Sequence, residues 1–280
     1  MSLTIDLHTH STASDGALPP AELAAYLAER GVQAWALTDH DCIEGLAEAQ
    51  QASQGLGLDF YNGVELSLCW QNLAVHVVGL GFNADCPALA EQLDQQSQRR
   101  QQRARAMAER LAAAGIAGIY QRACELAGND RAIGRPHLAR ALVADGYCKQ
   151  ESEAFRRYLG QGKRAHVGIE WPTLEQGIEW LHQAGGKAVL AHPHRYGLSA
   201  GKLRRLLNAF VEAGGDAMEV VCGNLPADRI RHLGSLAQKR KLLASVGSDL
   251  HSPEQRWLRP GQLSVLPEGC QAIWPHLNLA

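Results

Sequence analysis

Short apolar segments with the composition of β-strands alternate with helical segments along most of the 280-residue chain. Several of them are rich in Val, Ile or Leu, some are bounded by glycine, and near-continuous apolar runs suit parallel strands buried on both faces. The segments lie at residues 3–8, 33–38, 58–66, 75–82, 187–191, 217–222 and 242–248. Seven strands with interleaved helices predict an α/β fold, a β/α barrel that is one strand short of the eightfold form.

Two of the helices between these strands have recognisable ends. Pro19 and Pro20 open a helical segment, and Gly31 closes it. Thr173 and Gln176 have the spacing of a capping box at the start of another helix. These signals place helices in the connections between predicted strands.

The alternation stops between residues 99 and 167. This stretch predicts four helical segments, at residues 99–114, 119–127, 137–145 and 152–159, each followed by a glycine. We therefore expect a barrel in two parts, residues 1–98 and 168–280, which flank a small inserted helical subdomain at residues 99–167.

The expected insert is basic. It has 14 Lys and Arg against 6 Asp and Glu, a net charge of +8, whereas the whole chain has −2 and the remainder therefore −10. A basic segment beside an acidic body suggests a polyanionic substrate that meets a metal-binding core. A solvated, Arg-rich helical surface would explain the same charge equally well.

The composition argues against several other classes of protein. No apolar run approaches the roughly 20 residues that a membrane helix needs, and residues 1–6 lack the features of a signal peptide. The seven cysteines are scattered and never spaced as C-x-x-C, which disfavours a disulfide framework and a Cys-ligated zinc site. A reducing cytoplasm is the expected compartment, with neither a membrane nor an obligate protein partner.

Histidines and carboxylates recur at or near the C-terminal ends of almost all the predicted strands, where barrel enzymes build their active sites. A single histidine in an apolar strand, such as His76, is usually a satisfied core residue. Nine ligand-type residues near successive strand ends are hard to explain as packing, because burying so many ionisable groups without a cation is costly. The nine are His8, His10, Asp15, His40, Glu65, His76, His192, Asp249 and His251. They predict two or three divalent ions, with Mn²⁺ first and Fe²⁺ or Zn²⁺ as alternatives.

In their order along the chain these residues resemble the PHP family, the polymerase and histidinol phosphatase domain. The motifs are Asp6-x-His8-x-His10, Thr38-Asp39-His40, Glu65, His76, Ala191-His192-Pro193 and Ser248-Asp249-x-His251. The resemblance implies a distorted (β/α)7, amidohydrolase-like barrel with a trinuclear metal site. The insert, with Ile133-Gly134-Arg135-Pro136-His137, is similar to the branch that contains the 3′,5′-nucleotide bisphosphate phosphatases. Relatives in that branch include a 5′-to-3′ exoribonuclease acting on short RNA.

The resemblance also implies how the ligands divide among three ions. The expected sets are His8, His10, Glu65 and Asp249; Glu65, His76 and His192; and Asp15, His40 and His251, with Glu65 bridging the first two.

Five further residues are candidates for catalysis or substrate binding. His194 is expected to bind phosphate or to donate a proton to the leaving oxygen, with a structural histidine as the alternative. Arg135 is expected to clamp a substrate phosphate, because its planar fork matches phosphate oxygens; a surface arginine is the alternative. Asp39 is expected to orient a ligand histidine. His137 and Arg195 are weaker candidates for substrate contact.

Three functions remain open at this point. The first is removal of the 3′-phosphate from a nucleoside 3′,5′-bisphosphate, such as phosphoadenosine phosphate, by metal-activated hydroxide. The second is a 5′-to-3′ exoribonuclease on short oligonucleotides, although the insert is poor in the aromatic residues that stack on bases. The third is a metal-binding module without turnover, which a full set of nine ligands disfavours.

Overall fold

The computed structural model describes residues 3–128 and 133–280. The chain divides into two compact units, one formed by Met1–Gln92 with Trp171–Ala280 and the other by Leu93–Glu170. The second unit includes residues 99–167, where an insert was expected. The domain boundaries of that insert stay a prediction.

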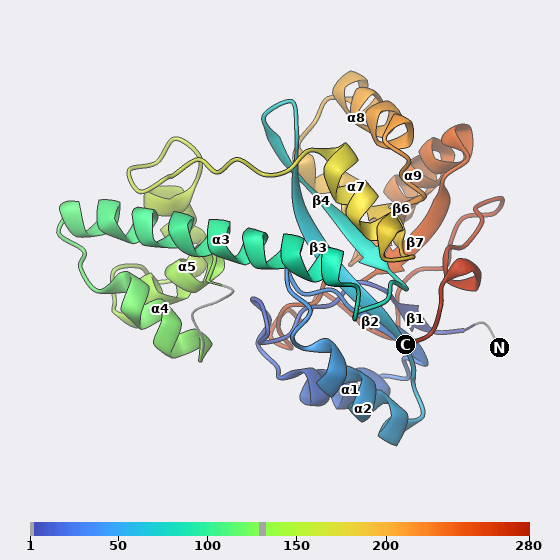
Figure 1. Ribbon diagram of the computed structural model, residues 1–280, viewed down its shortest axis with the longest axis horizontal. Coiled ribbons are helices and arrows are strands. Elements are labelled where there is room, and N and C mark those ends of the chain that lie inside the picture. Colours follow the sequence, from blue (N-terminus) through green and yellow to red (C-terminus); the bar gives the residue numbers. More distant parts are fainter. Residues whose placement is uncertain (1–2, 129–132) are drawn as a thin grey trace. The chain divides into compact units, whose positions relative to one another are not determined.

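The first unit is built on one sheet of seven strands, which lie side by side in the order in which they follow along the chain (Figure 1). The strands are β1 (Ile5–Asp6), β2 (Ala34–Leu37), β3 (Asp59–Trp70), β4 (Leu73–Leu80), β5 (Lys187–Leu190), β6 (Ala217–Cys222) and β7 (Leu243–Gly247). Each lies in or overlaps a segment that the sequence predicts as a strand.

The first and last strands meet, so that the sheet curls into a nearly closed barrel. The Leu7 N–H donates to the Val246 carbonyl at 3.0 Å, and the Asp249 N–H donates to the His8 carbonyl at 2.8 Å. Glycine is required at this seam, because a Cβ on Gly247 would lie 2.4 Å from the Cβ of His8. The α/β barrel predicted from the sequence is thereby confirmed.

Strand β4 runs antiparallel to both of its neighbours, which corrects the expectation of parallel strands throughout. Only Gln71 and Asn72 separate β3 from β4, and both have positive φ, 48° and 64°. A two-residue connection closes an antiparallel hairpin, whereas a parallel pair needs a crossover of a dozen or more residues. The turn therefore dictates the direction of β4.

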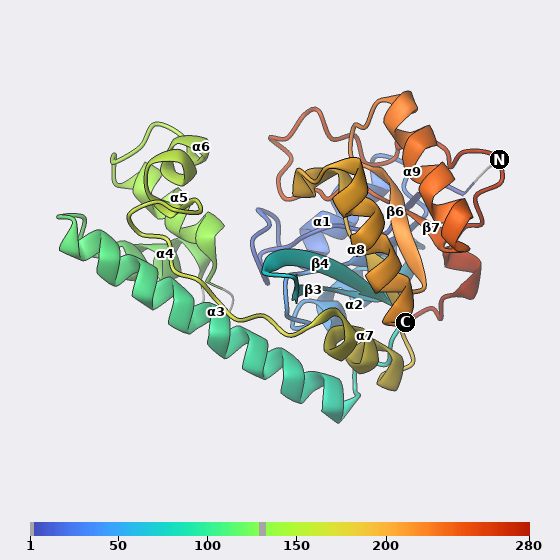
Figure 2. The ribbon, with the colours of Figure 1, turned by 90° about the horizontal axis from the view of Figure 1, so that it is seen from above.

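Helices cover the outside of the barrel. They are α1 (Pro20–Ala28), α2 (Leu46–Leu56), α7 (Leu174–Gln183), α8 (Ala200–Glu212) and α9 (Ala227–Arg240), with short 3-10 turns at Pro193–Tyr196 and Trp274–His276. α1 and α2 lie against each other, and α9 lies beside β6 and β7 (Figure 2). The capping box at α7 is present: the Gln176 N–H donates to Thr173 Oγ1 at 3.4 Å, and the Thr173 N–H donates to Gln176 Oε1 at 3.0 Å. Helices α7 and α9 thus pack against strands whose ends carry the polar residues.

The second unit is helical and has its own apolar core. It contains most of α3 (Pro87–Ala113), then α4 (Ile119–Ala127), α5 (Arg135–Ala144), α6 (Glu151–Ala154) and a π-helical turn (Phe155–Leu159). Met107, Leu111, Leu138 and Leu142 are among its fully buried side chains. α3 begins at Pro87 rather than at residue 99, as a proline at the first helical position permits. In the described part of the chain no helix is both long and apolar enough to cross a membrane.

We predict that Asp216 stabilises the barrel in a pH-dependent way. Its carboxylate lies 2.9 Å from Lys187 Nζ, 2.8 Å from His182 Nε2 and 2.9 Å from the Ala188 N–H. Burial opposes ionisation, but these hydrogen bonds outweigh it and hold the pKa of Asp216 below its ordinary value. Asp216→Asn should cost about 1 kcal/mol in unfolding free energy near neutral pH.

A depressed carboxyl pKa contributes stability above the unfolded value, about 3.9, and this stability is lost as the pH falls through the folded value. Urea unfolding should therefore show the penalty of Asp216→Asn shrinking between about pH 7 and about pH 3. The exposed Asp59→Asn is the matched control. An equal penalty at both pH values would contradict this account.

Candidate metal centre

The first strand leads directly into the site. His8 and His10 follow β1 at a spacing of two, and both are fully buried. Their Nε2 atoms lie 3.1 Å apart. Asp249, which follows β7, lies beside them: its Oδ1 is 3.4 Å from His8 Nε2 and 3.3 Å from His10 Nε2. His8, His10 and Asp249 therefore form a group whose ligand atoms all lie within 4.8 Å of one another, close enough to hold one ion.

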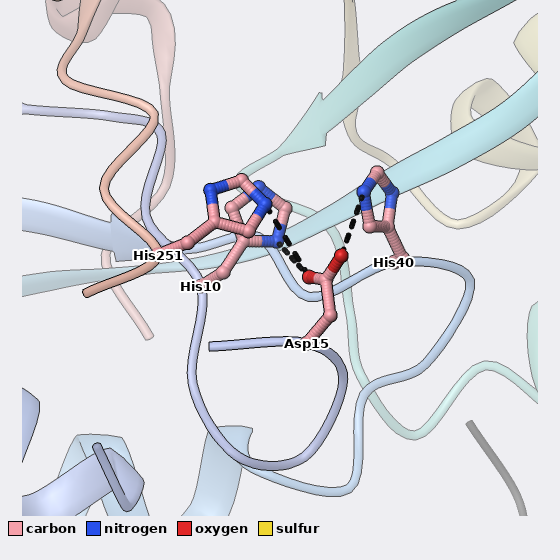
Figure 3. Close-up of side chains that lie close together, drawn as sticks. All are labelled: His10, Asp15, His40 and His251. Atoms are coloured by element: carbon pink, nitrogen blue, oxygen red, sulfur yellow. Dashed lines mark ion pairs between the residues drawn. The ribbon is translucent and has the colours of Figure 1, made fainter. Parts of the chain in front are cut away.

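A second group gathers around Asp15 (Figure 3). The Asp15 carboxylate lies 3.7 Å from His10 Nδ1, 3.8 Å from His40 Nε2 and 3.4 Å from His251 Nε2. These residues come from the segments that follow β1, β2 and β7. His10 belongs to both this group and the first, so the two groups share a ligand.

Glu65 on β3 is the centre of a third group. Its carboxylate lies 3.0 Å from His40 Nδ1, 2.9 Å from His76 Nδ1 and 2.9 Å from His192 Nε2. It also lies 3.3 Å from His10 Nε2. The structure thus brings all nine sequence-predicted ligand residues into one connected cluster.

His76 reaches this cluster because β4 is antiparallel. It pairs with Ser67 in the first half of β4, not at the carboxyl end of the strand. The amino-terminal half of an antiparallel strand lies at the same rim as the carboxyl ends of its parallel neighbours. The expectation of ligands at carboxyl ends is therefore wrong for His76 in detail, although the residue faces Glu65.

The donor set and its electrostatics fit divalent ions. Burial alone would raise the pKa of the Glu65 carboxyl, but His40, His76 and His8 hold it well below its ordinary range. Burial would likewise lower the pKa of His10, but Asp249 and Glu65 raise it to about 10. The buried carboxylates thus require positive charge from protonated histidines or from cations. Among the described residues, the buried His10 Nδ1, which lies 3.7 Å from Asp15, has no hydrogen-bond partner, so this nitrogen is available as a metal ligand.

Positive φ angles in the backbone also help to orient the ligand residues. His192 and Asp249 have φ values of 28° and 56°, and Asp41, beside His40, has 51°. Non-glycine residues rarely adopt this left-handed region, and such conformations concentrate at functional sites. Each lies just after a barrel strand, where the sharp turn directs a ligand toward the cluster.

Glu219 also belongs to the site, although it is not among the residues predicted from the sequence. It lies in the middle of β6, fully buried, with Oε1 2.6 Å from His8 Nδ1 and Oε2 2.5 Å from the His192 N–H. Burial would raise the pKa of Glu219, but His8 and His192 hold it below its ordinary value. One carboxylate inside an otherwise apolar strand, Ala217–Cys222, was the available signal.

Asp39 is hydrogen-bonded to the loop that follows His10. Its carboxylate accepts hydrogen bonds from the Ser11 N–H at 2.8 Å, the Ser11 hydroxyl at 2.6 Å and the Ser14 hydroxyl at 2.6 Å. Asp39 therefore holds the loop that presents Asp15, and its expected role in orienting a ligand histidine stays a prediction.

The remaining candidates lie in two places. His194 and Arg195 belong to the 3-10 turn after β5, and the Arg195 guanidinium pairs with the Asp249 carboxylate. Burial, with Arg195 and His192, lowers the pKa of His194 to about 4, which favours a neutral ring. Arg135 and His137 belong to the helical unit. His137 is buried there, and its Nδ1 accepts a hydrogen bond from the Gly134 N–H at 3.1 Å, which caps α5.

Comparison with curated proteins finds relatives over nearly the whole chain. A 3′,5′-nucleoside bisphosphate phosphatase from Chromobacterium violaceum is 43% identical over 98% of this chain and 96% of its own length. A 5′-3′ exoribonuclease Rnm from Escherichia coli is 44% identical over 96% of this chain and 92% of its own length.

Solved structures agree. An amidohydrolase from Chromobacterium violaceum, solved with sulfate and no metal, superposes with a TM-score of 0.92 at 42% identity, covering 98% of this chain and 95% of its own. A metal-dependent phosphoesterase from Bifidobacterium adolescentis superposes with a TM-score of 0.80 at 27% identity, covering 96% and 92%. The family model of the PHP domain matches residues 6–171. With the buried histidine–carboxylate cluster that the barrel assembles, these matches show that the chain belongs to the PHP domain family.

Proposed function

We propose that this protein hydrolyses the 3′-phosphate of nucleoside 3′,5′-bisphosphates, for example phosphoadenosine phosphate to AMP and phosphate. The observation that carries the proposal is the 43% identity, over 98% of the chain, to a phosphatase named for that substrate class. The connected cluster of histidines and carboxylates supports it, because that donor set suits ions that catalyse phosphoryl transfer.

We assign three ions, Mn²⁺ first among the candidates, to the centre. The proposed ligand sets are His8, His10, Glu65 and Asp249; Glu65, His76 and His192; and Asp15, His40 and His251. Close approaches within each set support this division. Glu65 lies within 3.4 Å of histidines from all three sets, and it is proposed to bridge the first two. When bound, such ions lower the pKa of water and offset the charge of phosphoryl oxygens.

The chain's own residues would bind and orient the substrate. His194 is held next to His192 by the 3-10 turn. It is proposed to donate an N–H hydrogen bond to a phosphate oxygen or to donate a proton to the leaving oxygen. Arg195 already contacts Asp249 and half of its side chain is buried, so it is proposed to place positive charge beside the substrate phosphate.

A cluster of arginines in the helical unit supports a second phosphate contact. Burial, together with the nearby charges of Arg135 and Arg100, lowers the pKa of Arg103 to about 10. Arg135 is likewise half-buried, and Arg100 lowers its pKa. Like charges held together and partly desolvated favour an anion, and Arg135 is proposed to clamp it. His137 remains a weaker candidate, since its ring caps α5.

A 5′-to-3′ exoribonuclease on short oligonucleotides is the second candidate. It is favoured by the 44% identity to the Escherichia coli enzyme of that name. The same ions and the same basic unit would serve an RNA substrate. A cytoplasmic location is proposed with either activity.

The first prediction concerns metal binding. Adding Mn²⁺ at about 100 times its Kd to chelator-treated protein should raise the melting temperature by roughly 5–10 °C, because only the folded protein holds the assembled ligands. His8→Ala should lose most of this increase, whereas the exposed His232→Ala should keep it. Equal increases for both variants would contradict the assignment of the centre.

The second prediction concerns the substrate. With Mn²⁺ supplied, the purified protein should release phosphate from a nucleoside 3′,5′-bisphosphate. Release from other monoesters but not from this compound would refute the proposal. Stepwise shortening of a 3′-labelled short RNA would establish the exoribonuclease activity, and both results together would mean that one site performs both reactions.

The third prediction concerns Arg135. Arg135→Met removes a hydrogen-bonded positive charge worth about 1.5–3 kcal/mol to a bound phosphate, so KM should rise roughly 10- to 100-fold while kcat changes little. Arg229→Met, at an exposed position on α9, is the control and should leave both constants unchanged. An unaltered KM in Arg135→Met would mean that Arg135 does not contact the substrate phosphate.

A further inference from the structure

Glu219 is an acidic residue in a buried strand, and its neighbours in the sequence do not explain why a carboxylate is there. Its neighbours in β6 are apolar and buried, and only 1% of Glu219 is exposed. A carboxylate is costly to bury unless it is hydrogen-bonded, so its partners indicate what it does.

Both carboxylate oxygens are used, and each contacts a different proposed metal ligand. Oε1 lies 2.6 Å from His8 Nδ1, and Oε2 accepts the backbone N–H of His192 at 2.5 Å. His8 follows β1 and His192 follows β5, so β6 connects two residues that are far apart in the sequence.

The contact with His8 determines which ring nitrogen faces the other ligands. A carboxylate only accepts hydrogen bonds, so Nδ1 must carry the proton, and Nε2 keeps its lone pair for a metal. His8 Nε2 is the nitrogen that lies 3.4 Å from both Glu65 and Asp249. The contact with His192 holds a backbone that has a φ of 28°, which few residues other than glycine adopt.

We propose that Glu219 is a positioning residue for the metal centre: it fixes the His8 tautomer and the His192 backbone together, and so couples the ligand group around Asp249 to the one around Glu65. The inference rests on the proposed metal-dependent function. A carboxylate behind a ligand histidine typically changes metal affinity 10- to 100-fold when it is removed.

Glu219→Gln is the sharpest test, because it keeps the shape and removes one acceptor. An amide has one oxygen and one NH₂ group, so it cannot accept from both His8 Nδ1–H and the His192 N–H. We expect metal affinity, measured by competition with a chelator, to fall about 10- to 100-fold, and bound metal per chain to fall in elemental analysis. Glu219→Asp keeps both acceptor oxygens on a shorter side chain, so its metal affinity should lie between those of Glu219→Gln and wild type.

A matched variant separates positioning from general loss of stability. Met218 is fully buried on the same strand and precedes Glu219, so its side chain points to the other face. Met218→Ala should lower the melting temperature but leave metal affinity within about twofold of wild type. In zinc-loaded protein with nitrogen-labelled histidine, NMR should show a proton on His8 Nδ1 in wild type and an altered His8 signal in Glu219→Gln.

The outcomes are distinguishable. If Glu219→Gln binds metal as tightly as wild type, or if Met218→Ala loses as much affinity, the proposal is wrong. If wild type binds metal but releases no phosphate from the bisphosphate, the proposed function fails while the role of Glu219 stands.

Discussion

The convergence of histidines on the buried Glu65 carboxylate is the interaction on which the rest of the molecule depends. His76 on β4, with His40 and His192 from the segments after β2 and β5, approaches it at 2.9–3.0 Å. His8 and His10 approach it from the segment after β1. No local stretch of chain could bring these groups together, so the closed order of strands is what makes the site. Conversely, the site is costly without compensating positive charge, because its carboxylates are removed from water.

The reversed strand β4 follows from the same requirement. A hairpin with two residues between β3 and β4 places His76 beside Glu65 with no crossover helix. The departure from the regular β/α pattern thus lies where the centre needs two adjacent strands to contribute ligands. Glu219 and Asp39 support the ligand residues from behind the cluster. Glu219 is hydrogen-bonded to His8 and His192, and Asp39 to the loop that carries Asp15.

Much of this architecture could be predicted from the sequence, for identifiable reasons. Buried strands appear in the sequence as apolar runs, and the histidines and carboxylates near their ends depart from that pattern. The strands and the nine clustered side chains could therefore be predicted. The direction of β4 was not, because Gln71-Asn72 lacks the glycine that usually marks such a turn. Glu219 was missed because a single acid in a strand carries no spacing signal, and its two partners lie 211 and 27 residues away. The start of α3 was placed too late, since Pro87 marks the true beginning.

The left-handed backbone at His192 and Asp249 has a consequence for how such a protein evolves. Each such residue costs on the order of 1–3 kcal/mol, which the surrounding barrel must offset. Glycine would relieve the cost at either position but would delete a side chain that the cluster uses. Selection for thermal robustness alone would favour that exchange, so these two positions mark where stability and activity trade against each other in this fold.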